Sequence, residues 1–253
     1  MWLVDVQGTL IDDLHRQPLP GAIDFILDLK KRGEPFLLIT NNTKYPPQEF
    51  LRYLQEIGFA IEAHEYLDAL MNLQAHLPEK RIFAIGNEGF LHTLEKMGYE
   101  LTNDKPEAVV VGIKEKLTYD DLADATEHLL AGARLVGMHE TSLYAKHGRR
   151  YPGLGAILRA LEYATGQKAV IVGKPSPSFY QLALERLGAE PREVTIISDD
   201  PKGDLVGAKK LGMRTFFVLS GKYQRTDEII PLLSPSDRPD EIYQSVAQIK
   251  GEG

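Results

Sequence analysis

The chain has 253 residues, of which 43% are hydrophobic and 26% charged, and 36 acidic residues outnumber 29 basic ones to give a formal net charge of −7. This is the composition of a globular protein that is large enough to bury one big core or two moderate ones. It lacks the basic excess of a nucleic-acid binder, and the absence of cysteine excludes disulfides, Cys-ligated zinc, iron–sulfur clusters and a thiol nucleophile.

No apolar run approaches the ~18 residues that a membrane-spanning helix needs. The first apolar stretch contains Asp5, and neither a basic segment nor a cleavage signature accompanies it. We therefore expect a mature chain in the cytoplasm, with no membrane among its partners.

Short apolar runs of strand length alternate with helix-length periodic segments along almost the whole chain. The predicted strands are 2–6, 36–39, 81–85, 108–112, 134–138, 169–172, 194–197 and 215–219. One predicted helix is opened by Pro20 and stopped by Gly33, another is opened by Pro46 and ended by Gly58, and the others are 89–97, 119–130, 154–164, 178–187 and 203–211. This rhythm predicts an α/β fold with a parallel sheet covered by helices. Because there is no repeat and no long linker, a second domain would have to be inserted rather than appended.

Asp5 is a carboxylate embedded in the first apolar run, and Gln7, Gly8 and Thr9 follow it. A buried charge is costly unless a partner compensates it. A sharp turn at Gly8 would place Asp5 at the carboxyl edge of the sheet, where open α/β folds bind their ligands. The alternative is an aspartate that only caps the next loop, and this motif alone does not decide between the two.

Asp199, Asp200 and Asp204 form a second acidic group directly after the run 194–197. Carboxylates this close repel one another, and a hard cation such as Mg²⁺, which takes oxygen ligands, would relieve the repulsion. A helix N-terminus, where aspartate is favoured, also explains Asp200 and Asp204. It leaves unexplained why Asp199 stands at a strand end.

Two further strand ends carry polar side chains. Thr40 and Asn41 follow 36–39 and offer hydroxyl, amide and backbone donors for an oxyanion, and Lys174 follows 169–172 and offers a cation. Turn chemistry and a solvated lysine explain each of them separately. Because all four signals fall at the ends of strands of one predicted sheet, a shared site is the better explanation.

In order and spacing, these motifs resemble those of the haloacid dehalogenase (HAD) superfamily over essentially the whole chain. The family's four motifs look like 5–9, Thr40 with Asn41, Lys174, and Asp199 with Asp204. The stretches 40–42, 151–156, 172–177 and 220–223 resemble the NagD-like, p-nitrophenylphosphatase-type branch, whose type IIA cap is inserted between the second and third motifs. The resemblance implies a Rossmann-like catalytic core formed by 1–77 and 169–253, and a smaller α/β cap domain formed by 78–168.

The resemblance also implies a Mg²⁺-dependent phosphatase. Asp5 would attack phosphorus and form an aspartyl-phosphate that water later hydrolyses. Mg²⁺ would be held by Asp5, Asp199 and the backbone carbonyl of Gln7, with Asp200 behind these ligands.

The transferred phosphoryl group would have its own set of residues under this resemblance. Lys174 would neutralise developing charge and restrain the nucleophile, and Asp204 would position Lys174 or a metal-bound water. The phosphate would be bound by Thr40, Asn41, Lys174 and Gly8.

Gln7 departs from the family pattern, because it stands where the family usually has the general acid that protonates the leaving group. A primary amide has no useful proton to give near neutral pH, and losing positioned acid–base catalysis costs about 10²- to 10⁴-fold in rate. Poor alkoxide leaving groups should suffer most, so aryl, acyl and P–N phosphates and pyrophosphate become the favoured substrates. The phospholysine, phosphohistidine and pyrophosphate phosphatases of this branch are similar in having a non-acidic residue there.

Two smaller departures lie in the fourth motif. Ser198 stands where a glycine usually precedes the first aspartate, and Gly203 stands where a threonine is common before the last. The change at Gly203 could loosen the helix start that presents Asp204.

Specificity in this branch resides on the cap, and the candidate segment here is 138–150, in which His139, Lys146 and Arg149 would contact the substrate. Its basic character would suit an anionic substrate tail, although a solvated loop explains any one of these residues equally well. The expected partner is a small phosphorylated molecule and not a nucleic acid. The sequence is also compatible with a homodimer.

The alternative function is that of a catalytically weak or silent HAD-fold protein that binds phosphorylated metabolites as a sensor or scaffold. Gln7 alone favours it, whereas the retention of the other motif residues argues against it. Dehalogenation or phosphonate cleavage is a third candidate. The acidic fourth motif disfavours metal-free dehalogenation, and no cap lysine is clearly placed for a Schiff base.

Overall fold

The computed structural model describes residues 1–146 and 149–249. The chain divides into two compact units. The first unit comprises Met1–Thr40, Gln48–Leu67 and Pro177–Gly253, and the second comprises Asn41–Pro47 and Asp68–Ser176.

The first unit is built on a six-stranded sheet in the order β13-β12-β11-β1-β2-β3. Strand β1 pairs in parallel with β2 on one side and β11 on the other, and Leu3 stands opposite both Leu37 and Ile196. All four residues of β1 are buried, as expected of a strand covered on both faces. The strands are β1 (Trp2–Asp5), β2 (Phe36–Thr40), β3 (Tyr66–Asp68), β11 (Thr195–Ser198), β12 (Arg214–Val218) and β13 (Glu241–Tyr243).

Four α-helices and several short helical turns complete this unit. Helix α1 ends at Gly33, whose left-handed φ of 65° lets its N–H bond the carbonyls of Leu29 and Lys30. The helices are α1 (Ala22–Arg32), α2 (Pro47–Glu56), α7 (Pro177–Leu187) and α8 (Val206–Lys210). The turns are η1 (Ala63–Glu65), η2 (Pro191–Glu193), η3 (Pro201–Leu205), η4 (Thr226–Glu228), η5 (Ile230–Leu232), η6 (Pro235–Asp237) and η7 (Val246–Gln248), of which η3 is π-helical.

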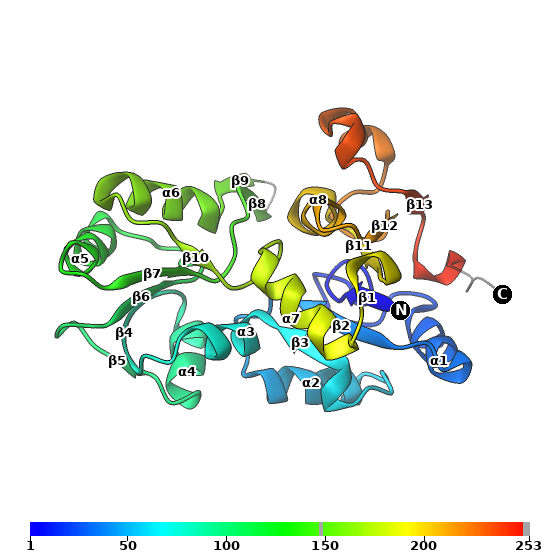
Figure 1. The fold of residues 1–253 in the computed structure, drawn as a ribbon, viewed down its shortest axis with the longest axis horizontal. Helices are drawn as coiled ribbons and strands as arrows, with labels where there is room; N and C mark the ends of the chain where they lie inside the picture. The colour runs from blue at the N-terminus through cyan, green and yellow to red at the C-terminus, as the bar shows by residue number, and fades with distance from the viewer. Residues whose placement is uncertain (147–148, 250–253) are drawn as a thin grey trace. The chain divides into compact units, whose positions relative to one another are not determined.

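The second unit has a parallel five-stranded sheet in the order β10-β7-β6-β4-β5 and an antiparallel hairpin, β8-β9. Helices α5 and α6 lie together on one side of the sheet and α4 lies on the other (Figure 1). The strands are β4 (Arg81–Ile85), β5 (Glu100–Leu101), β6 (Ala108–Val111), β7 (Arg134–Gly137), β8 (Leu143–Lys146), β9 (Arg149–Pro152) and β10 (Val170–Ile171). The helices are α3 (Ala69–His76), α4 (Glu88–Lys96), α5 (Tyr119–Leu130) and α6 (Leu154–Thr165).

The structure confirms the predicted α/β class with parallel sheets, and it adds elements that the sequence did not reveal: α3, β3, β5, β13 and the β8-β9 hairpin. The predicted helix 203–211 is a π-helical turn followed by the short α8. The second unit takes in more of the chain than the predicted 78–168, because Leu70 and Leu73 of α3 and Val172 beyond β10 pack into its core. Its action as a cap stays a prediction.

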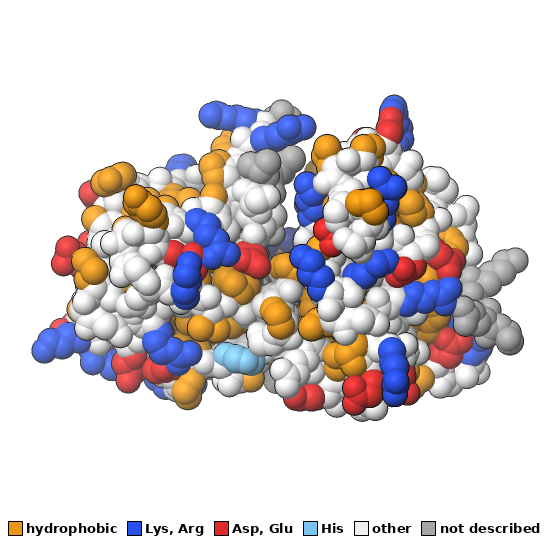
Figure 2. All heavy atoms as spheres, turned by 45° about the horizontal axis from the view of Figure 1, so that its top comes forward, with side chains coloured by type: hydrophobic (Ala, Val, Ile, Leu, Met, Phe, Trp, Pro, Cys, Tyr) orange, Lys and Arg blue, Asp and Glu red, His pale blue; other side chains and the backbone are white. Residues whose placement is uncertain are grey.

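The surface carries charges of both signs. On the face drawn in Figure 2, Lys and Arg side chains are interspersed with Asp and Glu, so this face presents mixed charge rather than a continuous basic surface. Among the described residues, no helix combines the length and the hydropathy needed to cross a bilayer. The cytoplasmic location stays a prediction.

Candidate active site

Asp5 and Asp199 stand at the ends of neighbouring strands of the first unit and are linked by Thr9. Asp5 is the last residue of β1, Asp199 directly follows β11, and both side chains are buried, with 4% and 5% exposure. The Thr9 hydroxyl donates to Asp5 Oδ2 at 3.1 Å and accepts from the backbone N–H of Asp199 at 3.2 Å. One buried hydroxyl therefore orients the candidate nucleophile and the candidate metal ligand together.

Two glycines leave room for the Asp199 carboxylate. Gly8 has a left-handed φ of 75°, and a Cβ placed on it would lie 2.1 Å from Asp199 Oδ2. A Cβ on Gly221, beyond β12, would meet the same oxygen at 2.1 Å and Gly8 Cα at 2.4 Å. The Ser220 hydroxyl fastens the two loops by donating to the Gly8 carbonyl at 2.8 Å. Side chains at either glycine would displace Asp199.

The Asp199 carboxylate carries an uncompensated electrostatic cost. Burial raises its pKa well above the usual range, and the neighbouring Asp5 adds to the rise. The backbone N–H of Lys222, which donates to Asp199 Oδ2 at 2.6 Å, opposes the shift without cancelling it. Two buried, mutually repelling carboxylates of this kind are an oxygen donor set that suits a divalent cation.

A second hydrogen-bonded group holds Asp204. Ser198, the last residue of β11, donates to Asp204 Oδ2 at 2.6 Å and accepts from the backbone N–H of Asp200 at 3.1 Å. Serine at this position, a departure from the family pattern, thus holds the Asp204 carboxylate and the backbone of Asp200. Asp200 Oδ1 accepts from the backbone N–H of Gly203 at 2.9 Å and caps η3, where a Cβ on Gly203 would lie 2.4 Å from Asp200 Oδ2. Gly203 therefore permits this cap.

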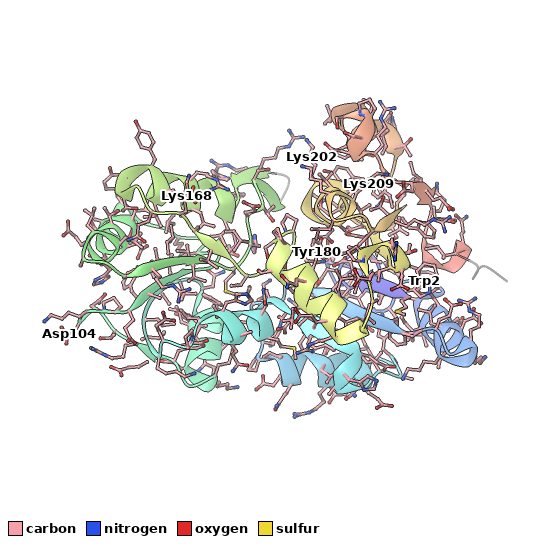
Figure 3. All side chains as sticks on the ribbon, in the orientation of Figure 1. Trp2, Asp104, Lys168, Tyr180, Lys202 and Lys209 are labelled. Atoms are coloured by element: carbon pink, nitrogen blue, oxygen red, sulfur yellow. The ribbon has the colours of Figure 1, made fainter. Side chains whose placement is uncertain are left out.

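Tyr180 supports the same turn from α7, where Figure 3 labels it. Its hydroxyl donates to the Asp204 backbone carbonyl at 2.8 Å, and the side chain is fully buried. Burial raises the pKa of the phenol well above its normal value, and Asp204 and Asp5 add to the rise. Tyr180 consequently stays protonated and remains a hydrogen-bond donor at neutral pH.

Lys222 brings a cation to the acidic group. Its ammonium donates to Asp200 Oδ2 at 2.7 Å, next to the backbone contact with Asp199. Partial burial opposes the charge, but the attraction of Asp200 and Asp199 outweighs it and raises the pKa of Lys222. Lys222 is therefore a permanent cation in the physiological pH range.

Gln7 contacts the candidate phosphate-binding threonine. The hydroxyl of Thr40, at the end of β2, donates to Gln7 Oε1 at 2.7 Å. The amide oxygen is thus engaged by a neighbouring side chain, and the amide itself carries no titratable proton. At this position the chain orients Thr40 where the family usually has an acid.

Asn41 and Lys174 are brought together in the second unit. The Asn41 side chain accepts from the Lys174 backbone N–H at 2.7 Å and donates to the Lys174 carbonyl at 3.1 Å. Gly173 makes this approach feasible, since a Cβ there would lie 2.5 Å from Asn41 Oδ1. The Asn41 amide therefore holds the Lys174 backbone, which leaves the backbone N–H of Asn41 as its candidate phosphate donor.

The predicted specificity residues also lie in the second unit. Desolvation lowers the pKa of His139 to about 4, so this imidazole is neutral at pH 7, and its Nδ1 accepts from the Thr141 backbone N–H at 3.4 Å. Arg149 in β9 is exposed, with its guanidinium 5.3 Å from the centre of the Tyr151 ring. Lys146 belongs to β8, and its side chain lies outside the described part of the structure.

The predicted site residues thus fall into two sets. In the first unit the structure assembles Asp5, Gln7, Gly8, Thr40, Asp199, Asp200 and Asp204, and in the second it assembles Asn41 with Lys174. Their catalytic roles stay predictions. Among the described residues, no three His, Asp or Glu side chains gather as a metal-binding group. Asp5 and Asp199 are the two carboxylates of the predicted metal site.

Sequence reasoning missed the roles of Thr9, Ser198, Tyr180 and Lys222. Ser198 and Lys222 could have been found, because each lies at or just beyond the end of a predicted strand, as the other site residues do. Tyr180 carried no comparable signal, since it lies within a helix and reaches Asp204 only through tertiary packing.

Comparisons with known proteins identify the family of this chain. Residues 2–100 match a family model of haloacid dehalogenase-like hydrolases, and residues 171–249 match a HAD-hydrolase-like model. The chain is 35% identical over 227 residues to haloacid dehalogenase-like hydrolase domain-containing protein 2 of Homo sapiens, a match that covers 89% of this chain and 86% of the relative.

Two microbial phosphatases are similar over nearly their whole length. Ribonucleotide monophosphatase NagD of Escherichia coli is 29% identical over 251 residues, covering 98% of this chain and 96% of the relative. A solved NagD structure gives a TM-score of 0.79 at 27% identity over 98% of this chain and 97% of the other. A p-nitrophenyl phosphatase structure from Archaeoglobus fulgidus gives a TM-score of 0.84 at 26% identity, with 97% and 96% coverage. The chain therefore belongs to the haloacid dehalogenase-like hydrolase family, in its NagD-like branch of phosphatases.

Proposed function

We propose that this protein is a Mg²⁺-dependent phosphatase that acts on small phosphorylated molecules through an aspartyl-phosphate on Asp5 and favours good leaving groups. The observation that carries the proposal is the buried Asp5–Thr9–Asp199 arrangement at the ends of two parallel strands. Two of the similar proteins are named as a ribonucleotide monophosphatase and a p-nitrophenyl phosphatase, which supports a small phosphorylated substrate.

Mg²⁺ fits the donor set of the first unit. Asp5 and Asp199 supply two carboxylates whose repulsion a divalent cation would offset, and the absence of side chains at Gly8 and Gly221 leaves room for the Asp199 carboxylate at this place. The backbone carbonyl of Gln7 is the proposed third protein ligand. When bound, Mg²⁺ would neutralise charge on the phosphoryl oxygens and on the two carboxylates.

The chemical steps fall to Asp5 and water. A carboxylate oxygen of Asp5 forms a bond to phosphorus, and the bond from phosphorus to the leaving group breaks, so the leaving group departs with the electron pair. Water then attacks the phosphorus of the aspartyl-phosphate, which releases inorganic phosphate and restores the Asp5 carboxylate. Thr9 keeps the attacking side chain in one orientation during both steps.

Phosphoryl oxygens would be bound by Thr40, by backbone donors at Gly8 and Asn41, and by Lys174. The two hydrogen bonds between the Asn41 amide and the Lys174 backbone support a positioning role for the Asn41 side chain. Lys174 would offset the negative charge that develops in transfer.

Gln7 would restrict the range of leaving groups. Its amide has no proton to give near pH 7, so the proton that an alkoxide needs must come from solvent. Nitrophenolate, carboxylate and phosphate leave without that proton, and a phosphoramidate can take up a proton on nitrogen from solvent before its neutral amine leaves. Aryl and acyl phosphates, phosphoramidates and pyrophosphate are therefore the proposed substrate classes, while sugar phosphates should react slowly.

The test is phosphate release from p-nitrophenyl phosphate, acetyl phosphate, pyrophosphate and a sugar phosphate, with and without Mg²⁺. We expect Mg²⁺-dependent release from the first three substrates and its loss, by at least about 10³-fold, in Asp5→Asn. Asp24→Asn, which changes an exposed carboxylate in the same unit, is the control and should keep full activity. Release that persists in Asp5→Asn would overturn the proposed nucleophile.

A further inference from the structure

Lys222 makes two separate contacts with the acidic group of the first unit. Its backbone N–H donates to Asp199 Oδ2 at 2.6 Å, and its ammonium donates to Asp200 Oδ2 at 2.7 Å. The side chains of Lys222 and Asp200 are 39% and 20% exposed, so the ion pair is partly shielded from water. The contact ties the loop after β12 to the turn that presents Asp204.

The other lysines near this turn have different surroundings. Lys202 in η3 is exposed, and Lys209 in α8 forms an ion pair with Asp240 (Figure 3). Lys222 is thus distinguished from these two lysines by its bond to a carboxylate of the fourth motif.

We propose that Lys222 is a positioning residue and a resident counterion that sets the affinity of the proposed Mg²⁺ site. The inference rests on the proposed function for the identity of the metal. It goes beyond that function because it gives a role to a lysine outside the four motifs. Lys222 would make the metal-free fold more stable and metal binding weaker.

The physical argument is the distribution of charge. Asp5, Asp199 and Asp200 repel one another, and the ammonium of Lys222 offsets part of this repulsion at all times. The same positive charge repels an incoming divalent cation. Lys222 therefore stabilises the protein without Mg²⁺ and weakens the binding of Mg²⁺, and both effects disappear when its charge is removed.

Lys222→Met tests this with Mg²⁺ as the probe, titrated into the whole purified protein by calorimetry without substrate. We expect the dissociation constant for Mg²⁺ to fall about ten-fold at low ionic strength, and the difference from wild type to shrink as salt is added. The melting temperature in EDTA should fall as well. Lys222→Arg should restore wild-type affinity, because the positive charge and the donor remain.

Lys210→Met is the matched control. It removes the same charge from an exposed position on α8 and should leave the affinity for Mg²⁺ within about two-fold of wild type. Asp200→Asn should weaken Mg²⁺ binding, and adding Lys222→Met to it should tighten binding by less than Lys222→Met does alone.

Several results would overturn the inference. They are an unchanged or weaker affinity in Lys222→Met, an equal change in Lys210→Met, and a failure of Lys222→Arg to restore binding. If wild type releases phosphate normally while one of these is observed, only the role of Lys222 fails. If wild type does not bind Mg²⁺ at all, the inference and the metal dependence of the proposed function fail together.

Discussion

Thr9 is hydrogen-bonded to both residues that carry the central carboxylates, Asp5 and Asp199. It donates to Asp5 and accepts from the Asp199 backbone, so the orientation of either group depends on the other. The hydrogen bond from Thr9 offsets part of the cost of burying the Asp5 carboxylate, but the pKa of Asp199 remains well above its usual range. Two buried carboxylates therefore cost the first unit stability, and this is the cost that the proposed cation would offset.

Asp199→Asn should reveal this cost. A carboxyl whose pKa is raised on folding stabilises the fold below its unfolded pKa, and that stabilisation is lost as pH rises, so Asp199 destabilises the metal-free protein at pH 7. In EDTA at pH 7 we expect Asp199→Asn to melt at a higher temperature than wild type, with a free energy of unfolding about 1–2 kcal/mol larger. It should also lose the stabilisation that MgCl₂ gives to wild type. Calorimetric melting measures both.

Asp124→Asn, at an exposed position of α5, is the control for the change of net charge. It should leave the response to MgCl₂ intact. A lower melting temperature of Asp199→Asn in EDTA would contradict the electrostatic account.

Among the structural elements, the turn after β1 requires glycine at position 8. Gly8→Ala combines a left-handed backbone with a Cβ that would press on Asp199, whereas Gly33→Ala at the end of α1 meets the backbone strain alone, since no atom lies within 4 Å of its Cβ. Both variants should lose about 1 kcal/mol of stability from the positive φ. Only Gly8→Ala should also lose phosphatase activity, by at least about ten-fold, because a 1 Å shift of a reacting group is enough for such a loss.

The measurement is a steady-state assay of both variants beside urea unfolding. Equal activities of Gly8→Ala and Gly33→Ala would show that the close approach of Gly8 and Asp199 has no catalytic consequence.

Helix α6 in the second unit carries a buried carboxylate, Glu162. Its effect on stability should depend on pH in the opposite sense to that of Asp199. Burial disfavours its charge, but hydrogen bonds from the Ala169 backbone N–H at 2.9 Å and from Arg159 outweigh burial and lower the pKa. A lowered pKa gives stability that is present above the unfolded pKa and is lost as pH falls through the folded one. Glu162→Gln should therefore cost about 1 kcal/mol at pH 7.

That cost should shrink as the pH is lowered below about 4.5, the range in which the wild-type carboxylate takes up a proton. Denaturant unfolding across pH 3–7 checks it. The matched variant Glu127→Gln, at an exposed position of α5, should show no such trend. A cost of Glu162→Gln that is independent of pH would contradict the account.

At the scale of the whole molecule, the sequence predicts what depends on local pattern. Strands such as β1 and β6 were predictable because their residues are buried on both faces and form continuous apolar runs. Helix α3 was not predicted because its buried residues include Asn72 and show little helical periodicity. Strand β13 was not predicted because it is a short, partly exposed edge strand. In the site, strand-end residues such as Asp5 were predictable, whereas the contact of Tyr180 with Asp204 arises only when distant segments pack.

The proposed role of Gln7 is to restrict the protein to substrates whose leaving groups need no proton from the enzyme. The most direct test is the dependence of kcat/KM on leaving-group pKa, measured with Mg²⁺ for wild type and Gln7→Asp from nitrophenyl phosphates to a sugar phosphate. We predict a steep decline for wild type and a shallower one for Gln7→Asp, which should gain at least about ten-fold on the sugar phosphate. Equal slopes, or a wild type as fast on the sugar phosphate as on p-nitrophenyl phosphate, would contradict the account.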